Sequence, residues 1–210
     1  VIGNRTQLLR VDEESDHPVG GHELEQIKAY LRFQIDSGIN VIIFQDYDKG
    51  VISEELIKEV VDLSLKKGIP VTVDPKKRNF ISYKGVTLFK PNLKELKDGL
   101  NIEVNPEDVM QLQQAINQLQ QKLQAEMVLL TLSEDGVLIS YKNNGQKSYR
   151  ILPSHVRTIS DVSGAGDTVI SVASLCLALK TNPEILAAIS NLAGGLVCEK
   201  PGVVPVDKQQ

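Results

Sequence analysis

Hydrophobic residues recur along the chain with two different spacings. Over residues 22–38 and 53–68 they recur every three or four positions, which predicts amphipathic helices. Ser53 is suited to cap the second of these helices, and Gly68 is suited to end it. Short apolar runs rich in β-branched residues predict strands that are buried on both faces, and they cover residues 40–46, 69–75 and 86–92.

The second half of the chain continues this alternation. Residues 105–124 predict a third amphipathic helix, capped by Asn105. Its apolar spacing also matches a heptad for a few turns, but packing on a sheet is the expected use. Residues 126–141 predict a strand, a turn and a second strand, and two strongly apolar helices are expected over 164–180 and 183–200.

This order of elements predicts an α/β fold in which helices cover both faces of a mainly parallel sheet, in a single domain over residues 1–210. In such sheets, ligands bind beyond the carboxyl ends of the strands. Polar residues gather at those ends, and we expect them to converge on one crevice: Asp46, Asp74, Asn92, Thr131 and Ser133.

Composition and charge narrow the classes of partner. The 210 residues include 23 Lys and Arg and 27 Asp and Glu, a net charge of -4 with no block of like charges. We therefore expect the partner to be a small molecule rather than nucleic acid or an anionic membrane surface. No apolar stretch is long enough to span a bilayer. Cys176 and Cys198 both fall in apolar helical patterns, which indicates buried thiols and a cytoplasmic location.

The segment Gly164-Ala165-Gly166-Asp167 directly precedes a strongly apolar helix. A helix start presents unpaired N–H groups and the positive end of the macrodipole, and glycines let a phosphate approach the backbone closely. Asp167 would repel such a ligand, so we interpret it as a general base that accepts a proton from a substrate hydroxyl during phosphoryl transfer. The alternative is an acidic residue that merely stabilises the first helical turn.

Several stretches, in order along the chain, resemble the ribokinase-like (PfkB-type) carbohydrate kinases. "DVSGAGDTVISVASL" resembles the family's carboxyl-terminal signature, and "KPNLKEL" resembles its Asn-x-x-Glu motif. "TLSEDGVLI" is similar to the nucleotide segment, although Ser133 stands where the family usually has glycine. "SNLAGGLVCEKPG" resembles the helix and loop beside the adenine.

The resemblance implies ATP and Mg²⁺ as cofactors and gives roles to individual residues. Asp167 matches the catalytic base, and Gly164, Ala165 and Gly166 match the anion hole. Glu95 matches a residue that holds Mg²⁺ through water. The residues that match positions along the nucleotide are Asn92, Thr131, Ser133, Gly136 and Asn191.

Two further pairs are implied less directly. Asp161 and Ser163 fall where some relatives hold a monovalent cation through their carbonyl groups, and Ser163 stands where threonine is commoner. Asp46 and Lys49 are candidate contacts to the sugar.

Within the family, "FQDYDKGVIS" and "VDPKKRNFISYKGVTLFKPN" resemble the kinase domain of the bacterial enzymes that make ADP-heptose for lipopolysaccharide. This likeness implies transfer of the γ-phosphoryl group of ATP to the anomeric hydroxyl of heptose 7-phosphate, and a homodimer for the full-length protein. The alternatives are another acceptor, such as ribose or fructose 6-phosphate, or a non-catalytic nucleotide-binding module on the same fold.

The residues themselves also allow simpler readings. Asn92 and Glu95 could form a capping box for the following helix. Thr131 and Gly136 could be ordinary strand and hairpin residues, and Asn191 could pair with neighbouring backbone. The run from Asp46 to Gly50 is also common turn chemistry.

The resemblance also implies that family members carry an amino-terminal segment, with the first strands and most of the lid, before the point that matches Val1. We therefore expect residues 1–15 to be a lid or edge-strand region. For this chain alone we expect weak nucleotide binding, little turnover and self-association through an unpaired sheet edge.

Overall fold

The structure is a computed structural model that describes residues 2–3, 6–7, 13–155 and 159–206. Its helices are α1 (Gly21–Asp36), α2 (Glu54–Lys67), α3 (Leu93–Leu100), α4 (Val109–Leu123), α5 (Ala165–Ala178) and α6 (Pro183–Cys198). Its strands are β1 (Ile2–Gly3), β2 (Thr6–Gln7), β3 (Ile42–Gln45), β4 (Val71–Asp74), β5 (Leu88–Phe89), β6 (Met127–Thr131), β7 (Val137–Asn143) and β8 (Gln146–Leu152). A short 3-10 turn, Ser133–Asp135, joins β6 to β7.

The central sheet has six strands in the order β3-β4-β5-β6-β7-β8. From β3 to β6 the neighbours are parallel, whereas β6, β7 and β8 pair antiparallel as successive hairpins. The parallel part matches the fold class predicted from the sequence. The carboxyl ends of these parallel strands lie at one edge of the sheet, where we expected the polar residues to meet.

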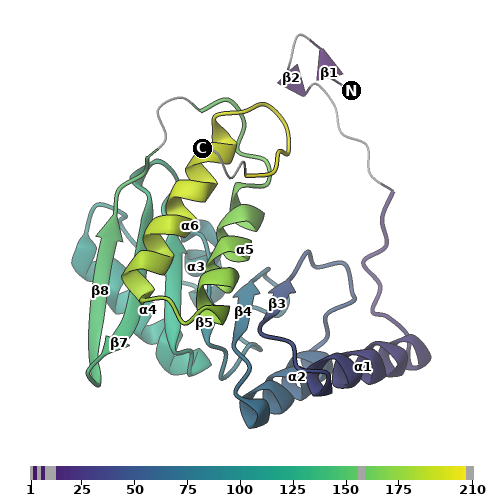
Figure 1. Cartoon of the computed structure of the whole chain (residues 1–210). Coiled ribbons are helices and arrows are strands. Elements are labelled where there is room, and N and C mark those ends of the chain that lie inside the picture. Colours follow the sequence, from purple (N-terminus) through teal and green to yellow (C-terminus); the bar gives the residue numbers. More distant parts are fainter. Residues whose placement is uncertain (1, 4–5, 8–12, 156–158, 207–210) are drawn as a thin grey trace.

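Two hydrophobic clusters lie on opposite faces of this sheet. Val128 and Leu130 face the cluster that includes α2, α3 and α4, while Leu129 faces the cluster that includes α5 and α6. This alternation follows from the two-residue period of a strand. Figure 1 shows the resulting layers, with α5 and α6 in front of the sheet, α3 and α4 behind it, and α1 beside α2.

Capping residues set the start of α2 and of α4 and the end of α2. The Ser53 hydroxyl accepts the N–H of Leu56 at 3.2 Å, and Gly68 ends α2 in the left-handed region at φ 66°, as predicted. The prediction that Asn105 caps α4 is wrong. Its side chain accepts the N–H of Glu107 in a local turn, and Asp108 caps the helix by accepting two backbone N–H groups.

The amino-terminal strands do not join the central sheet. Strands β1 and β2 pair antiparallel with each other, and Figure 1 draws them away from the six-stranded sheet. Residues 1, 4–5 and 8–12 lie outside the described part of the chain, so the lid or edge-strand role of residues 1–15 stays a prediction.

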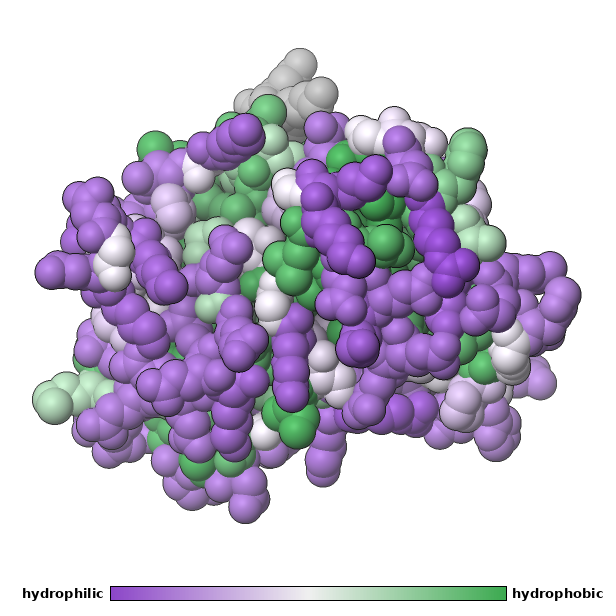
Figure 2. Space-filling model, turned by 90° about the horizontal axis from the view of Figure 1, so that it is seen from below, coloured by the Kyte–Doolittle hydropathy of each residue, from purple (hydrophilic) through white to green (hydrophobic). Residues whose placement is uncertain are grey.

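The face of the molecule seen from below is mostly polar. Figure 2 shows, from below, a hydrophilic face with small scattered hydrophobic areas, as is normal for a water-exposed protein surface. Among the described helices, none is long and apolar enough to cross a membrane. Cys176 and Cys198 are free and buried, and burial raises the pKa of both thiols.

Candidate active site

A cavity of about 740 Å³ opens at the carboxyl ends of the parallel strands. It contains most of the residues that the sequence singled out, from both halves of the chain. Those lining it are Asn92, Glu95, Thr131, Ser133, Gly136, Gly164, Ala165, Gly166, Asp167 and Asn191. Asp46, Lys49, Asp161 and Ser163 are not among the lining residues.

The start of α5 forms one wall of the cavity. Gly164 is the N-cap residue in the left-handed region, at φ 80°, and no side chain caps the helix. The N–H of Ala165 already bonds to the carbonyl of Val162 at 3.2 Å. The N–H groups of Gly166 and Asp167 have no partner within the helix, because the first turn leaves its donors unpaired. This is the local geometry of an anion site.

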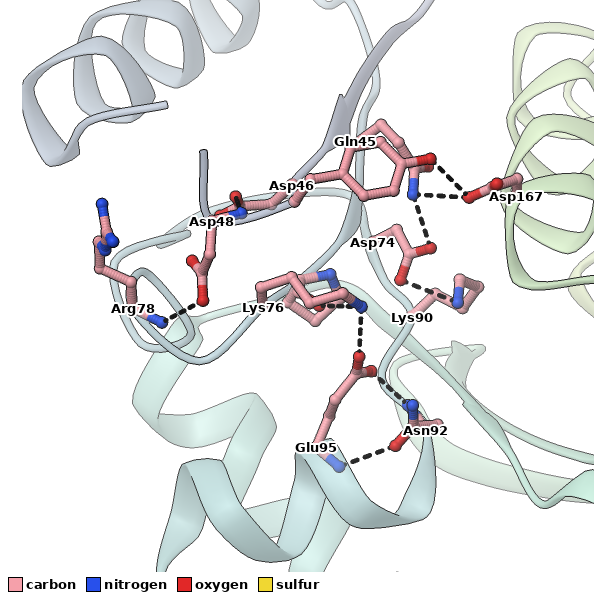
Figure 3. Close-up of polar contacts among 12 residues, drawn as sticks. Gln45, Asp46, Asp48, Asp74, Lys76, Arg78, Lys90, Asn92, Glu95 and Asp167 are labelled. Atoms are coloured by element: carbon pink, nitrogen blue, oxygen red, sulfur yellow. Dashed lines mark hydrogen bonds and ion pairs between the residues drawn. The ribbon is translucent and has the colours of Figure 1, made fainter. Parts of the chain in front are cut away.

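Asp167 lies in the first turn of α5 and is exposed to the cavity. Its Oδ1 atom accepts hydrogen bonds from Gln45 Nε2 at 2.9 Å and from the Tyr47 hydroxyl at 3.1 Å. Burial and then the charge of Asp167 raise the pKa of Tyr47, so the phenol remains a donor. Figure 3 shows Gln45 reaching Asp167 from the end of β3.

An ion pair lies beneath the same wall. Lys90 Nζ is 3.0 Å from Asp74 Oδ1, and both side chains are more than nine-tenths buried. A Cβ atom added to Gly166 would lie 3.6 Å from Lys90 Nζ and 3.7 Å from Asp74 Oδ2. The glycine therefore brings the backbone at the start of α5 to van der Waals distance from this pair.

Asn92 and Glu95 form the capping box that was considered as the simpler reading. Asn92 Oδ1 accepts the N–H of Glu95 at 2.8 Å, and Glu95 Oε2 accepts the N–H of Asn92 at 2.9 Å. Both residues nevertheless line the cavity, so the capping box also fixes their positions there (Figure 3).

Glu95 has a further partner in Lys76, whose Nζ lies 2.6 Å from Oε1. Burial alone would lower the pKa of Lys76. The hydrogen bond and charge of Glu95, together with Asp74 and Asp46, outweigh burial and raise that pKa. Lys76 therefore stays cationic beside the cavity, where a phosphate would also attract it.

The end of β6 and the turn after it line the same cavity. Thr131 is bridged to Asn92 as a parallel neighbour, which places the two polar residues side by side. Ser133 adopts φ 55°, a left-handed conformation that explains why glycine is usual there. Gly136 has φ 91°, and an added Cβ would meet the Leu152 carbonyl oxygen at 2.1 Å.

Asn191 lines the cavity from α6, and its Nδ2 donates to the carbonyl of Pro153 at 2.8 Å. The Asn191 side chain thus bonds to backbone, as the simpler reading had it, and its contact with adenine stays a prediction. Asp161 accepts the N–H groups of Ser163 at 2.9 Å and Gly202 at 3.0 Å. These bonds, first of all those from Ser163, lower the pKa of Asp161 and hold the loop before α5.

Asp46 and Lys49 do not line the cavity. The buried carboxylate of Asp46 accepts the Tyr83 hydroxyl at 2.6 Å and the Asn79 amide at 3.1 Å. Lys49 pairs with Glu14. We therefore assign Asp46 to holding its loop in place, and the sugar-contact interpretation has no support from the placement of either side chain.

The cavity lining also includes residues that were not singled out as site residues from the sequence, among them Gln45, Lys76 and Lys90. Gln45 is the last residue of β3, Lys90 directly follows β5, and Lys76 lies two residues beyond β4. Their positions at strand ends were the available signal, because that edge of a parallel sheet carries the site. Their pairings were hidden, since each joins segments distant in sequence.

The cavity offers ligands that suit Mg²⁺. Glu95 presents a carboxylate, the oxygen donor that this ion prefers. The oxygens of Glu95 are already bonded to Lys76 and Asn92, which suits contact through water rather than direct coordination. In the described part of the chain, no three His, Cys, Asp or Glu residues gather as a metal-binding group. Such an ion would therefore take further oxygen ligands from phosphates and water.

Sequence comparisons find relatives along the whole chain. It is 33% identical over 210 residues to the bifunctional protein HldE of Syntrophotalea carbinolica and 35% identical over 210 residues to that of Desulfatibacillum aliphaticivorans. The alignments cover 100% of this chain but 42% of each relative. The chain thus spans less than half the length of these curated relatives.

Solved structures share the fold at lower identity. Phosphofructokinase-2 from Escherichia coli, in complex with potassium, superposes with a TM-score of 0.76 at 18% identity, over 88% of this chain and 58% of that one. Arabidopsis thaliana ribokinase, complexed with ribose and ATP, superposes with a TM-score of 0.66 at 17% identity. That superposition covers 89% of this chain and 55% of the ribokinase chain. The fold is therefore ribokinase-like. Because the profile of the pfkB family carbohydrate kinases matches residues 18–209, the chain belongs to that family.

Proposed function

We propose that this chain is the larger part of an ATP-dependent sugar kinase domain in which Asp167 is the catalytic base. One observation carries the proposal: a single cavity holds Asp167, the uncapped start of α5, Asn92 and Glu95. The family to which the chain belongs supports the same reaction class. A module that only binds nucleotide would gain nothing from a carboxylate beside its anion site.

In this mechanism the acceptor hydroxyl lies between Asp167 and the γ-phosphoryl group of ATP. The Asp167 carboxylate accepts the hydroxyl proton as the oxygen forms its bond to phosphorus, while the bond from phosphorus to the β–γ bridging oxygen breaks and ADP leaves. The N–H groups of Gly166 and Asp167 face the charge that spreads over the transferred group, aided by the positive end of the α5 macrodipole. Because these donors are fixed in the fold, they need no reorganisation during the reaction.

The cations around the cavity position the phosphates. Lys76 is held by Glu95 and stays cationic, so it can neutralise nucleotide charge. Bound Mg²⁺ would neutralise the phosphate oxygens and reduce repulsion of the incoming hydroxyl. Glu95 would bind the water shell of that ion, and Asn92 and Thr131 would border the phosphates.

For the acceptor we propose heptose 7-phosphate, with phosphorylation at the anomeric hydroxyl, in a protein that makes ADP-heptose for lipopolysaccharide. The support is the likeness of "FQDYDKGVIS" and "VDPKKRNFISYKGVTLFKPN" to that subfamily, together with 33% and 35% identity to HldE proteins. Ribose and fructose 6-phosphate are the competing acceptors.

Phosphoryl transfer by the protein that carries this chain tests the proposal. ADP release is measured with ATP, Mg²⁺ and each of the three acceptors, for the natural protein and for Asp167→Asn. We expect the highest kcat/KM for heptose 7-phosphate, and a loss of about 10²- to 10⁴-fold in Asp167→Asn. ATP affinity should stay level or rise, because the variant removes a negative charge beside the phosphates.

Other outcomes are equally informative. A higher kcat/KM for ribose or fructose 6-phosphate would keep the kinase and replace the acceptor. ATP binding without turnover on any acceptor, unchanged by Asp167→Asn, would instead favour a nucleotide-binding module.

A further inference from the structure

The amide group of Gln45 joins two carboxylates that face the cavity. Its Nε2 atom lies 2.9 Å from Asp167 Oδ1 and 2.9 Å from Asp74 Oδ2. An amide nitrogen carries two N–H donors, so it can serve both acceptors at once. Figure 3 shows Gln45 at the end of β3, with Asp74 below it and Asp167 beside it.

Without such a bridge, two carboxylates this close would oppose each other's ionisation. Asp74 has its charge balanced by Lys90 on its other oxygen, at 3.0 Å. Asp167 has no cation among its hydrogen-bond partners in the described chain, and relies on Gln45 and the Tyr47 hydroxyl. The contacts form one line from Lys90 through Asp74 and Gln45 to Asp167.

The arrangement also orients the base. Both donors to Asp167 bind the same oxygen, Oδ1. A carboxylate held at one oxygen has its rotation restricted, while Oδ2 stays available to a hydroxyl. Gln45 also bonds to Asp74, which belongs to a buried ion pair, so the Gln45 amide is held at the end of the sheet.

We propose that Gln45 is a positioning residue of this kinase, which holds Asp167 ionised and correctly oriented by separating it from Asp74. The inference rests on the proposed role of Asp167 as the base. Gln45 itself transfers no proton. The charged and titratable groups that face Asp167 are Tyr47 after β3, Asp74 on β4 with Lys76 just beyond it, and Lys90 after β5.

Two substitutions distinguish the effect of the Gln45 N–H donors from the effect of the size of its side chain. Gln45→Met keeps the length and removes both N–H donors, so Asp167 faces Asp74 without a bridge. Gln45→Glu keeps the shape and adds a third carboxylate. We expect the pKa of Asp167 to rise by about one pH unit in the first variant and by more in the second.

Titration of the Asp167 carboxyl carbon by NMR, in the ligand-free 210-residue chain, measures this directly, with Asp167→Asn identifying the signal. The matched control is Gln118→Met, at an exposed position on α4. We expect the Asp167 pKa to be lowest, and equal, in the natural protein and Gln118→Met. It should be higher in Gln45→Met and highest in Gln45→Glu. An Asp167 pKa within about 0.3 pH units in all four proteins would overturn the proposal.

The pH dependence of kcat/KM in the full-length protein is the second readout. The acid limb should move to higher pH in the same order, so that the loss of activity is largest at low pH and shrinks as pH rises. A merely structural role would lower kcat/KM equally at every pH. That uniform loss, with unchanged Asp167 titration, contradicts the inference.

The two readouts keep the inference distinct from the proposed function. If the natural protein shows no phosphoryl transfer, the proposed function fails, whereas the NMR titration still decides whether Gln45 controls the ionisation of Asp167. If transfer occurs and depends on Asp167 but neither readout moves, the kinase stands and the role of Gln45 is wrong.

Discussion

Lys76 and Glu95 form an ion pair at the edge of the cavity, with Nζ and Oε1 2.6 Å apart. The same carboxylate closes the capping box of α3. The Glu95 side chain therefore caps α3 and also has the proposed role of binding hydrated Mg²⁺. A suitable substitution can separate these two roles.

Glu95→Gln is that substitution. Glutamine at this position retains the capping box, so we expect the free energy of unfolding to change by less than about 1 kcal/mol. It removes the negative charge that would attract the hydrated Mg²⁺, so the Mg²⁺ concentration for half-maximal transfer should rise about tenfold or more. Titration of activity with Mg²⁺ measures this. Glu103→Gln, at an exposed partner of Lys97, is the control, and equal Mg²⁺ requirements in both variants would contradict the assignment.

The buried pair of Lys90 and Asp74 should matter for stability. Lys90→Met leaves Asp74 buried without its cation, and we expect a loss of about 3–5 kcal/mol in the free energy of unfolding. The double variant with Asp74→Asn should lose less than the sum of the two single losses. Urea denaturation gives these values. Lys84→Met, on the exposed surface, should stay within about 0.5 kcal/mol of the natural chain, and a similarly small loss for Lys90→Met would refute the expectation.

Gly136 should tolerate no side chain. In Gly136→Ala the new Cβ would approach the Leu152 carbonyl oxygen to 2.1 Å at φ 91°, so we expect a loss of at least about 2 kcal/mol. Gly145→Ala is a matched comparison, because Gly145 also has positive φ, at 80°, but nothing lies within 4 Å of its added Cβ. Its loss should be limited to about 1 kcal/mol. Thermal denaturation ranks the two, and equal losses would show that backbone conformation alone matters.

Tyr83 should make the fold sensitive to alkaline pH. Burial, then its hydrogen bond to Asp46, raises the pKa of Tyr83 well above its ordinary value near 10. A raised folded-state pKa means that the unfolded chain releases this proton first. The stability is therefore complete below pH 10 and declines as pH rises above it, by up to about 1.4 kcal/mol per pH unit.

Tyr83→Phe removes this contribution. Urea denaturation at pH 9, 10 and 11 should show a smaller alkaline loss in the variant than in the natural chain, although other tyrosines and lysines titrate in both. Parallel losses over the three pH values would exclude Tyr83 as a source of the effect.

The sequence predicted those elements whose signals are local. Ser53 and Gly68 bound α2 because both caps act within one helical turn. Asn105 was misjudged because Asn and Asp are both good caps, and the Asn105 side chain instead accepts the N–H of Glu107 while Asp108 caps the helix that begins at Val109. Strand β8 was missed because most of its residues are polar, yet Asn144 and Gly145, both with positive φ, are the standard two-residue hairpin signal.

The candidate site was predictable to the extent that strand ends and motifs reveal it. Asp167, Asn92, Glu95 and Thr131 were named from the sequence, and the structure gathers them in one cavity. Contacts such as that between Gln45 and Asp167, 122 residues apart, leave no periodic or spacing signal. The same holds for Asp46, whose polar partners inside the fold could not be read from its turn-like surroundings.

The two acidic residues of the proposed reaction belong to opposite layers. Asp167 lies on α5 on one face of the sheet, and Glu95 lies on α3 on the other. The strand ends between these helices therefore set the distance between the proposed base and the proposed contact to hydrated Mg²⁺. A cavity-forming substitution in either hydrophobic cluster can thus change the gap between them without touching a ligand. Catalysis in this protein should then be lost at smaller packing defects than nucleotide affinity is.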